Sequence, residues 1–182
     1  PHDRDSMIYS DGAGATIIEA TDDEGGILAH ESATFSFDES KFLYFGNSFS
    51  KEEDPNIRYI KMYGRKIYEF ALSNVPKAMA SCLEKSRIDI TDVKKILIHQ
   101  ANEKMDEAII NRFYKLFKME TPAGIMPMSI HKLGNSSVAT VPTLYDLIVN
   151  GELEGQSLNK GDVIIFASVG AGMNINAIVY QM

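Results

Sequence analysis

The chain has 182 residues, 45% hydrophobic and 24% charged, and its formal net charge of −7 argues against a general nucleic-acid-binding protein, which needs a positive surface. Its apolar runs are too short to cross a bilayer and its N-terminus lacks a signal-peptide core, so we expect a cytoplasmic protein without a membrane partner. One cysteine and four histidines, scattered over positions 2, 30, 99 and 131, predict neither an intramolecular disulfide nor a metal site.

The first part of the chain predicts a β-hairpin. A β-branched run, Thr16-Ile17-Ile18, follows a glycine-rich turn at 11–15, and Gly25-Gly26 leads into a second apolar run at 27–29. From 35 to 55 the chain mixes aromatic and acidic residues without a clear period. We therefore expect an irregular connection there, of a length that is often functional or mobile.

Two amphipathic helices and a short strand follow. Apolar residues recur every three or four positions between Ile67 and Leu83, which predicts a long helix over 64–86. Pro76 lies inside it and should kink or break it near 72–75. A strand over 93–98 precedes a second helix from Asn102 to about Lys118, one side of which is basic: Lys104, Arg112, Lys115 and Lys118. By default such a basic side is a solvated helix surface.

The last part predicts a helix and a hairpin. Ser136 or Ser137 would cap a helix that runs towards Val149 and ends at Asn150-Gly151. Strands at 163–167 and 175–180 would be joined by a glycine-containing turn at 170–172. This turn and the stretch at 12–14 both lack the third glycine of dinucleotide sites, so we expect no nicotinamide cofactor. The order of elements predicts a mixed α/β sheet covered by helices.

Two polar clusters carry the chemistry. His99 directly follows the predicted strand 93–98, and Asn135 lies 36 positions later, after Gly134. A neutral imidazole and a carboxamide can both donate hydrogen bonds to one developing negative oxygen, as enolate chemistry requires. Taken alone, however, His99 reads more often as a histidine satisfied by the backbone, and Asn135 as a turn or cap residue.

The two clusters resemble motifs of a known family. His99-Gln100-Ala101-Asn102 is similar to the HQAN signature of the beta-ketoacyl-acyl carrier protein synthase III family, and residues 133–142 resemble that family's GNTSAASxP segment. The resemblance implies a thiolase-like fold in which 57–182 form the C-terminal half. Residues 1–56 would then be the last two strands of the N-terminal half and a connecting loop. The helix 64–86 would expose a broad apolar surface, because the half that stacks on it is absent.

The same resemblance implies an acyltransferase. Members condense an acyl-CoA primer with malonyl-acyl carrier protein, with loss of carbon dioxide, to start fatty acid synthesis. His99 and Asn135 would hold the thioester oxygen, and the backbone N–H of Ala171 would form half of an oxyanion hole. Further residues would contact the substrate or its carrier: Gly64, Gln100, Ala101, Asn102, Lys104 and Gly170. No cofactor is implied, and the family is homodimeric.

The nucleophile departs from the family pattern. The family carries the acyl group on a cysteine at the start of a buried helix of the first half, whereas Cys82 lies on the apolar face of another helix and reads as a core residue. We therefore expect a C-terminal part that is inactive alone. Two alternatives stay open: a condensing enzyme of secondary metabolism, and a non-catalytic module that binds carrier protein.

Overall fold

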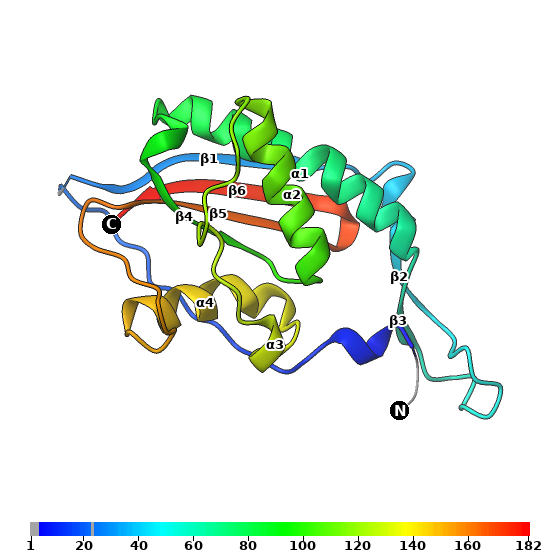
Figure 1. Cartoon of the computed structure of the whole chain (residues 1–182). Coiled ribbons are helices and arrows are strands. Elements are labelled where there is room, and N and C mark those ends of the chain that lie inside the picture. Colours follow the sequence, from blue (N-terminus) through cyan, green and yellow to red (C-terminus); the bar gives the residue numbers. More distant parts are fainter. Residues whose placement is uncertain (1–3, 23) are drawn as a thin grey trace.

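A mixed four-stranded sheet forms the centre of the computed structural model, which describes residues 4–22 and 24–182. Its strands lie in the order β1 (Gly26–Thr34), β6 (Asn174–Gln181), β5 (Val163–Gly170) and β4 (Val93–Ile98). Only β4 and β5 are parallel. Helices α1 (Gly64–Ser86) and α2 (Glu103–Leu116) cover one face, and α4 (Thr140–Val149) covers part of the other (Figure 1). The predicted mixed sheet covered by helices is confirmed.

The sheet buries apolar side chains on both faces because its strand residues alternate. Ile96, Ile98 and Ile165 belong to the larger core cluster, which includes buried residues of α1 and α2. Leu97 and Ile164 point the other way and form a smaller cluster with side chains of α4. The residues at the carboxyl ends of β4 and β5 are therefore held by packing from both sides. Within the described residues, no helix combines the length and apolar character needed to cross a bilayer.

The predicted N-terminal hairpin is wrong. Residues 16–18 lie outside any strand, and Ile17 and Ile18 are 95% and 76% exposed. The second run does form β1, which pairs with β6 from Gly26↔Gln181 to Thr34↔Asn174. The residues just before them pack beside the start of α4, on the opposite side of the molecule from α1 (Figure 1). β1, which lies before the predicted domain boundary, belongs to the same sheet as β4–β6, which lie after it. The division of the chain into two domains after residue 56 stays a prediction.

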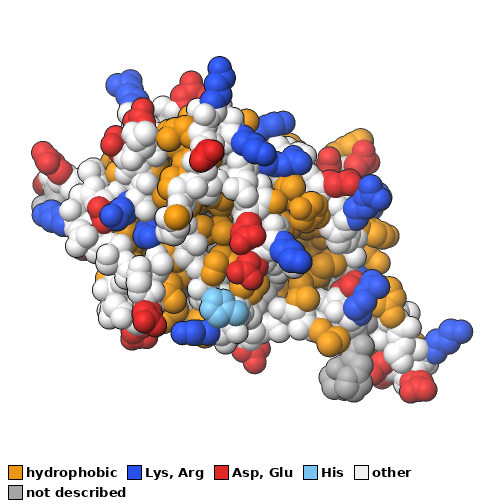
Figure 2. Space-filling model, in the orientation of Figure 1, with side chains coloured by type: hydrophobic (Ala, Val, Ile, Leu, Met, Phe, Trp, Pro, Cys, Tyr) orange, Lys and Arg blue, Asp and Glu red, His pale blue; other side chains and the backbone are white. Residues whose placement is uncertain are grey.

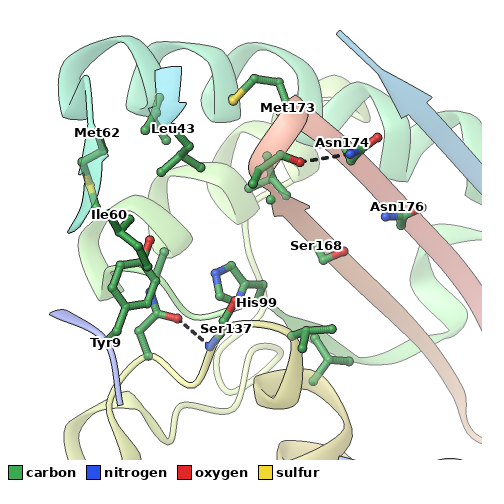
Figure 3. Close-up of a pocket in the computed structure, with 18 of the residues that line it drawn as sticks. Tyr9, Leu43, Ile60, Met62, His99, Ser137, Ser168, Met173, Asn174 and Asn176 are labelled. Carbon is green, nitrogen blue, oxygen red and sulfur yellow. Dashed lines mark hydrogen bonds between the residues drawn. The ribbon is translucent and has the colours of Figure 1, made fainter. Parts of the chain in front are cut away.

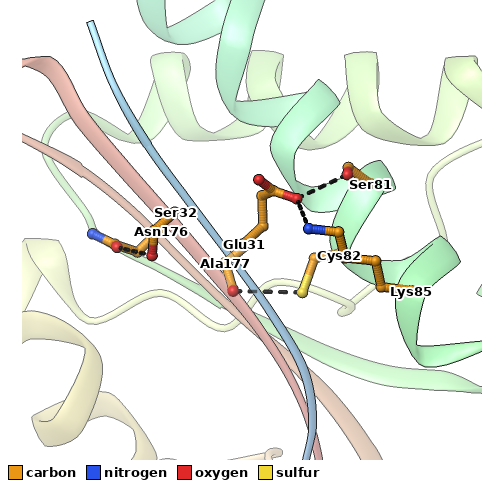
Figure 4. A network of polar contacts seen from close by, with 7 residues as sticks. All are labelled: Glu31, Ser32, Ser81, Cys82, Lys85, Asn176 and Ala177. Atoms are coloured by element: carbon orange, nitrogen blue, oxygen red, sulfur yellow. Dashed lines mark hydrogen bonds and ion pairs between the residues drawn. The ribbon is translucent and has the colours of Figure 1, made fainter.

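Edge strand β1 is held to α1 by a polar network. Lys85 Nζ and Ser81 Oγ, both on α1, lie 2.5 Å and 2.9 Å from Glu31 Oε2 (Figure 4). On the other face of the sheet, Ser32 Oγ donates to Asn176 Oδ1 at 2.8 Å. The lysine lowers the pKa of the Glu31 carboxyl below its ordinary value. Side chains thus hold this strand on both faces, to α1 on one face and to β6 on the other.

The apolar stripe of α1 is covered, contrary to the expectation of a broad unpartnered surface. Ala71, Val75 and Met79 are fully buried, because β1, β6 and α2 pack on them. Hydrophobic side chains reach the surface elsewhere in the view of Figure 2. Many of the exposed large ones lie between residues 7 and 63: Met7, Ile8, Ile17, Ile18, Phe35, Phe37, Tyr44, Phe45, Phe49, Ile57 and Tyr63. Val138 and Val149, at either end of α4, are also exposed.

Pro76 does not break α1, which is continuous from Gly64 to Ser86. Proline has no N–H, so the Leu72 carbonyl lacks its usual helical donor. Arg112 Nη1, on α2, donates to this oxygen at 3.4 Å, and Asn74 Nδ2 donates to the Phe70 carbonyl at 2.9 Å. One member of the predicted basic side of α2 therefore also ties the two helices together.

The stretch 35–55 is more regular than predicted. A 3-10 turn at Glu39–Phe42 leads into β2 (Leu43–Gly46), which pairs antiparallel with β3 (Tyr59–Met62). This pair and its connection, residues 43–62, form an arm that extends from the body beside the start of α1 (Figure 1). The strands were not apparent in the sequence because each has only four residues.

Helix α4 forms without the predicted serine cap. It begins at Thr140, after a 3-10 turn at Ser137–Ala139 and a short helix α3 (Ile130–Leu133), and no side chain caps it. The Ser137 N–H instead donates to Asn135 Oδ1 at 2.9 Å. Pro142 is the third residue of α4, where a missing N–H breaks no helical bond. The helix ends at Asn150-Gly151 as predicted, with Gly151 at φ 71°.

Candidate functional site

A cavity of about 710 Å³ opens where β4 and β5 end. His99, Ala101, Asn135, Gly170 and Ala171 all line it, so the structure brings both polar clusters to one place (Figure 3). Side chains of the arm and α2 complete the walls, among them Leu43, Ile60, Met62 and Met105. None of the described lining residues is an aspartate, glutamate, lysine or arginine. A hydrogen bond to a developing charge is worth more in such an apolar site than in water.

His99 is the first residue after β4. Its backbone N–H donates to the Ala167 carbonyl at 2.9 Å, which extends the β4–β5 pairing by one residue and fixes the histidine backbone. Burial lowers the pKa of His99 below its ordinary value, and a hydrogen bond with the Ser137 backbone opposes this only in part. The imidazole is therefore neutral at neutral pH and has a single ring N–H, which it can donate either to the Ser137 carbonyl or to a ligand in the cavity.

Asn135 is 2% exposed and follows Gly134, whose φ of 69° turns the chain towards the cavity. Its Oδ1 accepts the Ser137 N–H, the dashed bond beside Ser137 in Figure 3. Because the oxygen is engaged, the amide nitrogen Nδ2 is the group left to donate. A neutral imidazole and an amide N–H thus line the same cavity.

The β5–β6 turn contributes backbone to the site. Gly170 and Ala171 line the cavity, and Gly172 has a φ of 72°, a conformation that favours glycine. Asn174 Nδ2 donates to the Ala171 carbonyl at 3.0 Å, which holds the turn in this conformation. The backbone N–H of a residue in this turn, such as Ala171, can donate a hydrogen bond to an oxyanion whatever the side chain of that residue is.

Gln100 supports the fold and does not face the cavity. Its prediction as a substrate-binding residue is therefore corrected. Gln100 is fully buried and lies outside the cavity lining. Its Oε1 accepts the N–H groups of Ser129 and Ile130 at 2.8 Å and 2.9 Å, and its Nε2 donates to the Pro127 carbonyl at 2.9 Å. Gln100 therefore anchors the segment that leads to Asn135, and its complete burial outside the cavity lining keeps its amide from a ligand there.

Three other predicted residues lie outside the lining. Gly64 is the first residue of α1, and Asn102 caps α2 by accepting the Met105 N–H on Oδ1 at 3.2 Å. Lys104 is exposed in the first turn of α2, next to Met105, which does line the cavity. Their roles towards substrate stay predictions.

Cys82 lies in the core, away from the cavity. It is fully buried on α1, and its Sγ donates to the Ala177 carbonyl at 3.4 Å (Figure 4). Burial raises the pKa of this thiol above its ordinary value. A buried thiol with a raised pKa is a poor nucleophile, and Cys82 is not among the described residues that line the cavity.

The sequence analysis missed Tyr9, Ser168 and Asn176, which also line the cavity. Tyr9 forms a parallel bridge with Asn135, far away in sequence, so no local pattern could have placed it there. Ser168 and Asn176 lie on β5 and β6, on the face of the sheet that points away from α1. The alternation along the predicted strands was the only available signal for these two.

Residues 83–182 match a family described as 3-oxoacyl-[acyl-carrier-protein (ACP)] synthase III C terminal. The chain is 31% identical over 180 residues to a beta-ketoacyl-[acyl-carrier-protein] synthase III of Oenococcus oeni, covering 97% of the chain and 52% of that protein. It is 32% identical over 176 residues to a protein of the same name from Clostridium botulinum, covering 94% and 51%. The chain thus spans about half the length of the curated relatives it matches.

Solved structures agree in fold. The 3-oxoacyl-[acyl-carrier-protein] synthase III of Aquifex aeolicus superposes with a TM-score of 0.69 at 24% identity, over 90% of this chain and 46% of that one. A beta-ketoacyl synthase III of Thermus thermophilus gives 0.72 at 20% identity, over 91% and 49%.

Proposed function

Because the chain belongs to the 3-oxoacyl-[acyl-carrier-protein] synthase III family, we propose that it is the C-terminal part of an acyltransferase that condenses an acyl-CoA primer with malonyl-acyl carrier protein and so starts fatty acid synthesis. The predicted thiolase-like fold is confirmed by the solved structures. One observation carries the proposal: His99 and Asn135 line one cavity that has no charged residue among its described lining.

The first step proposed is decarboxylation. The thioester oxygen of the malonyl group accepts hydrogen bonds from the His99 ring N–H and from Asn135 Nδ2. The bond between the α-carbon and the carboxylate breaks, carbon dioxide leaves, and the electron pair delocalises onto the thioester oxygen as an enolate. Two fixed donors stabilise this charge, and each contributes about 3 kcal/mol to lowering the barrier. The lowered pKa of His99 suits the role, because a neutral imidazole donates without releasing its proton.

The second step proposed is carbon–carbon bond formation. The α-carbon of the enolate attacks the acyl carbonyl of a cysteine thioester, and the Ala171 N–H helps to stabilise the tetrahedral oxyanion. The carbon–sulfur bond then breaks, the cysteine leaves as thiolate, and the 3-oxoacyl product stays on the carrier. Cys82 is too deeply buried to supply this thiol. We therefore place the nucleophile in a part of the protein outside these 182 residues and expect no condensation by this chain alone.

The carrier protein is proposed to dock on the exposed basic side of α2. Lys104 and Lys115 are exposed on α2, and Lys118 is exposed two residues after its end. Lys104 stands beside the cavity wall at Met105. These charges suit an acidic carrier despite the negative total charge of the chain. Gly64, Ala101, Asn102 and Gly170 are kept as proposed contacts of the thioester arm. A homodimeric, cytoplasmic enzyme is part of the same proposal and follows from family resemblance.

The test is release of carbon dioxide from malonyl-acyl carrier protein by the full-length protein. His99→Ala and Asn135→Ala should each slow decarboxylation about 100-fold or more. His131→Ala is the matched control, because this histidine is exposed and lies outside the cavity. Normal decarboxylation by both site variants would refute the proposed mechanism.

A further inference from the structure

The segment that carries Asn135 is held by a distant part of the chain. Residues 9–14, here called the strap, lie against residues 133–142 (Figure 1). Ser10 donates twice: its N–H to the Asn135 carbonyl at 2.9 Å and its Oγ to the Leu133 carbonyl at 2.6 Å. Tyr9 bridges Asn135 and also lines the cavity (Figure 3). The strap therefore grips the backbone of the asparagine itself.

Two glycines make this close packing feasible. A Cβ added at Gly12 would lie 2.6 Å from Ser136 Cβ, and one at Gly14 would lie 2.5 Å from Pro142 Cγ. Real Cβ contacts are essentially never under 3.0 Å, so either addition would push the strap and the Asn135 segment apart. Neither glycine has a left-handed φ, so the predicted glycine-rich turn at 11–15 is wrong and close approach is the reason for both residues.

The Asn135 segment needs such support because it is strained and partly exposed. Ser137, which is not a glycine, has a left-handed φ of 55°, and Ser137 and Val138 are exposed. Gln100 anchors the segment from behind through Ser129 and Ile130. The strap is the contact on the other side. His99 is different, because the β4–β5 pairing fixes it directly.

We propose that the strap is a positioning element for the reaction: Ser10, Gly12 and Gly14 hold the Asn135 amide where it shares the thioester oxygen with His99. The inference rests on the proposed function, since it gives the amide a task. A carboxamide that moves by a fraction of an ångström loses its alignment with the developing charge, while the cavity and His99 are unchanged.

The test is Gly12→Ala in the full-length protein. We expect kcat for malonyl decarboxylation to fall about 100-fold, because a small misplacement of a catalytic group has an effect of that order. The rate of cysteine acylation by acyl-CoA should not change, because that step does not use Asn135. KM for malonyl-acyl carrier protein should change much less than kcat, because the bond from Asn135 strengthens as the charge develops on the thioester oxygen. Ala15→Ser is the matched control: it also adds one heavy atom, at an exposed position of the same segment. Adding Ser136→Gly to Gly12→Ala should restore decarboxylation, since it removes the Cβ that the new methyl would meet.

A second variant covers the case in which Gly12→Ala does not fold. Ser10→Ala removes only the Oγ bond to Leu133, should lower decarboxylation in the same selective way, and should be rescued by Ser10→Thr. Equal losses in acylation and decarboxylation would reduce the strap to a folding role and overturn the inference. Full activity of Gly12→Ala and Ser10→Ala beside an inactive Asn135→Ala would overturn it and leave the proposed function standing. An active Asn135→Ala would overturn the inference and also remove Asn135 from the proposed mechanism.

Discussion

Asp106 is an ionisable group buried in the core of a helix pair. It lies on α2 with 0% exposure, and neither carboxylate oxygen has a hydrogen-bond partner of good geometry among the described residues. Burial raises the pKa of Asp106 to about 8, the negative charges of Glu103 and Glu107 add to the shift, and the Asn102 backbone offsets it only in part. The folded protein therefore keeps this carboxyl protonated at neutral pH.

The sign of the pH dependence follows from this shift. Between pH 3.8, the ordinary pKa of an aspartate, and about 8, the folded chain holds a proton that the unfolded chain has released. The free energy of unfolding then falls as pH rises, by about 1.4 kcal/mol per pH unit, and the loss is complete above the folded pKa. From pH 3.8 to pH 7 the loss amounts to about 4 kcal/mol, a large share of the stability of an ordinary domain.

Asp106→Asn removes the titration and keeps the side-chain shape. In urea unfolding followed by circular dichroism, the free energy of unfolding of the variant should rise relative to that of the parent protein by about 1.4 kcal/mol per pH unit between pH 4 and 8. Above pH 8 the difference between the two should be constant. Asp92→Asn, the same substitution at an exposed aspartate, is the control. Parallel curves for Asp106→Asn and the parent would refute the reasoning, because they would mean that Asp106 is equally ionised in both states.

Two further predictions concern hydrogen bonds from side chains to the backbone and are measured as free energies of urea unfolding. Arg112→Met leaves the Leu72 carbonyl without its donor and should lower the free energy of unfolding by about 1 kcal/mol. In a Pro76→Ala background, residue 76 regains an N–H for this carbonyl, so the effect of Arg112→Met should be smaller. An equal effect in both backgrounds would contradict the proposed role of the Arg112 bond. Gln100→Leu leaves three backbone groups of segment 127–130 without their partner, two of them in buried hydrogen bonds, and should cost about 3 kcal/mol or more. A loss under about 0.5 kcal/mol would mean that water replaces the amide.

Local patterns were sufficient for most of the fold. The three-and-four spacing of apolar residues determined α1 and α2, and Asn102 marked the start of α2 because a cap acts on the next turn of its own helix. The alternating and continuous apolar runs likewise determined β4, β5 and β6. His99 could be located at a strand end for the same reason, since its position depends on the strand immediately before it.

Contacts between distant segments decided the rest. The run at 16–18 has strand composition but no strand partner, because the strap holds the preceding residues beside α4. Gly12 reads as a turn glycine locally, yet it is required by the Cβ of Ser136, more than a hundred residues away. The sequence predicted Gln100 as a ligand-binding amide, whereas in the folded chain its amide binds the backbone of segment 127–130. Periodicity reports which face of an element is buried, whereas only the assembled structure determines what each face meets.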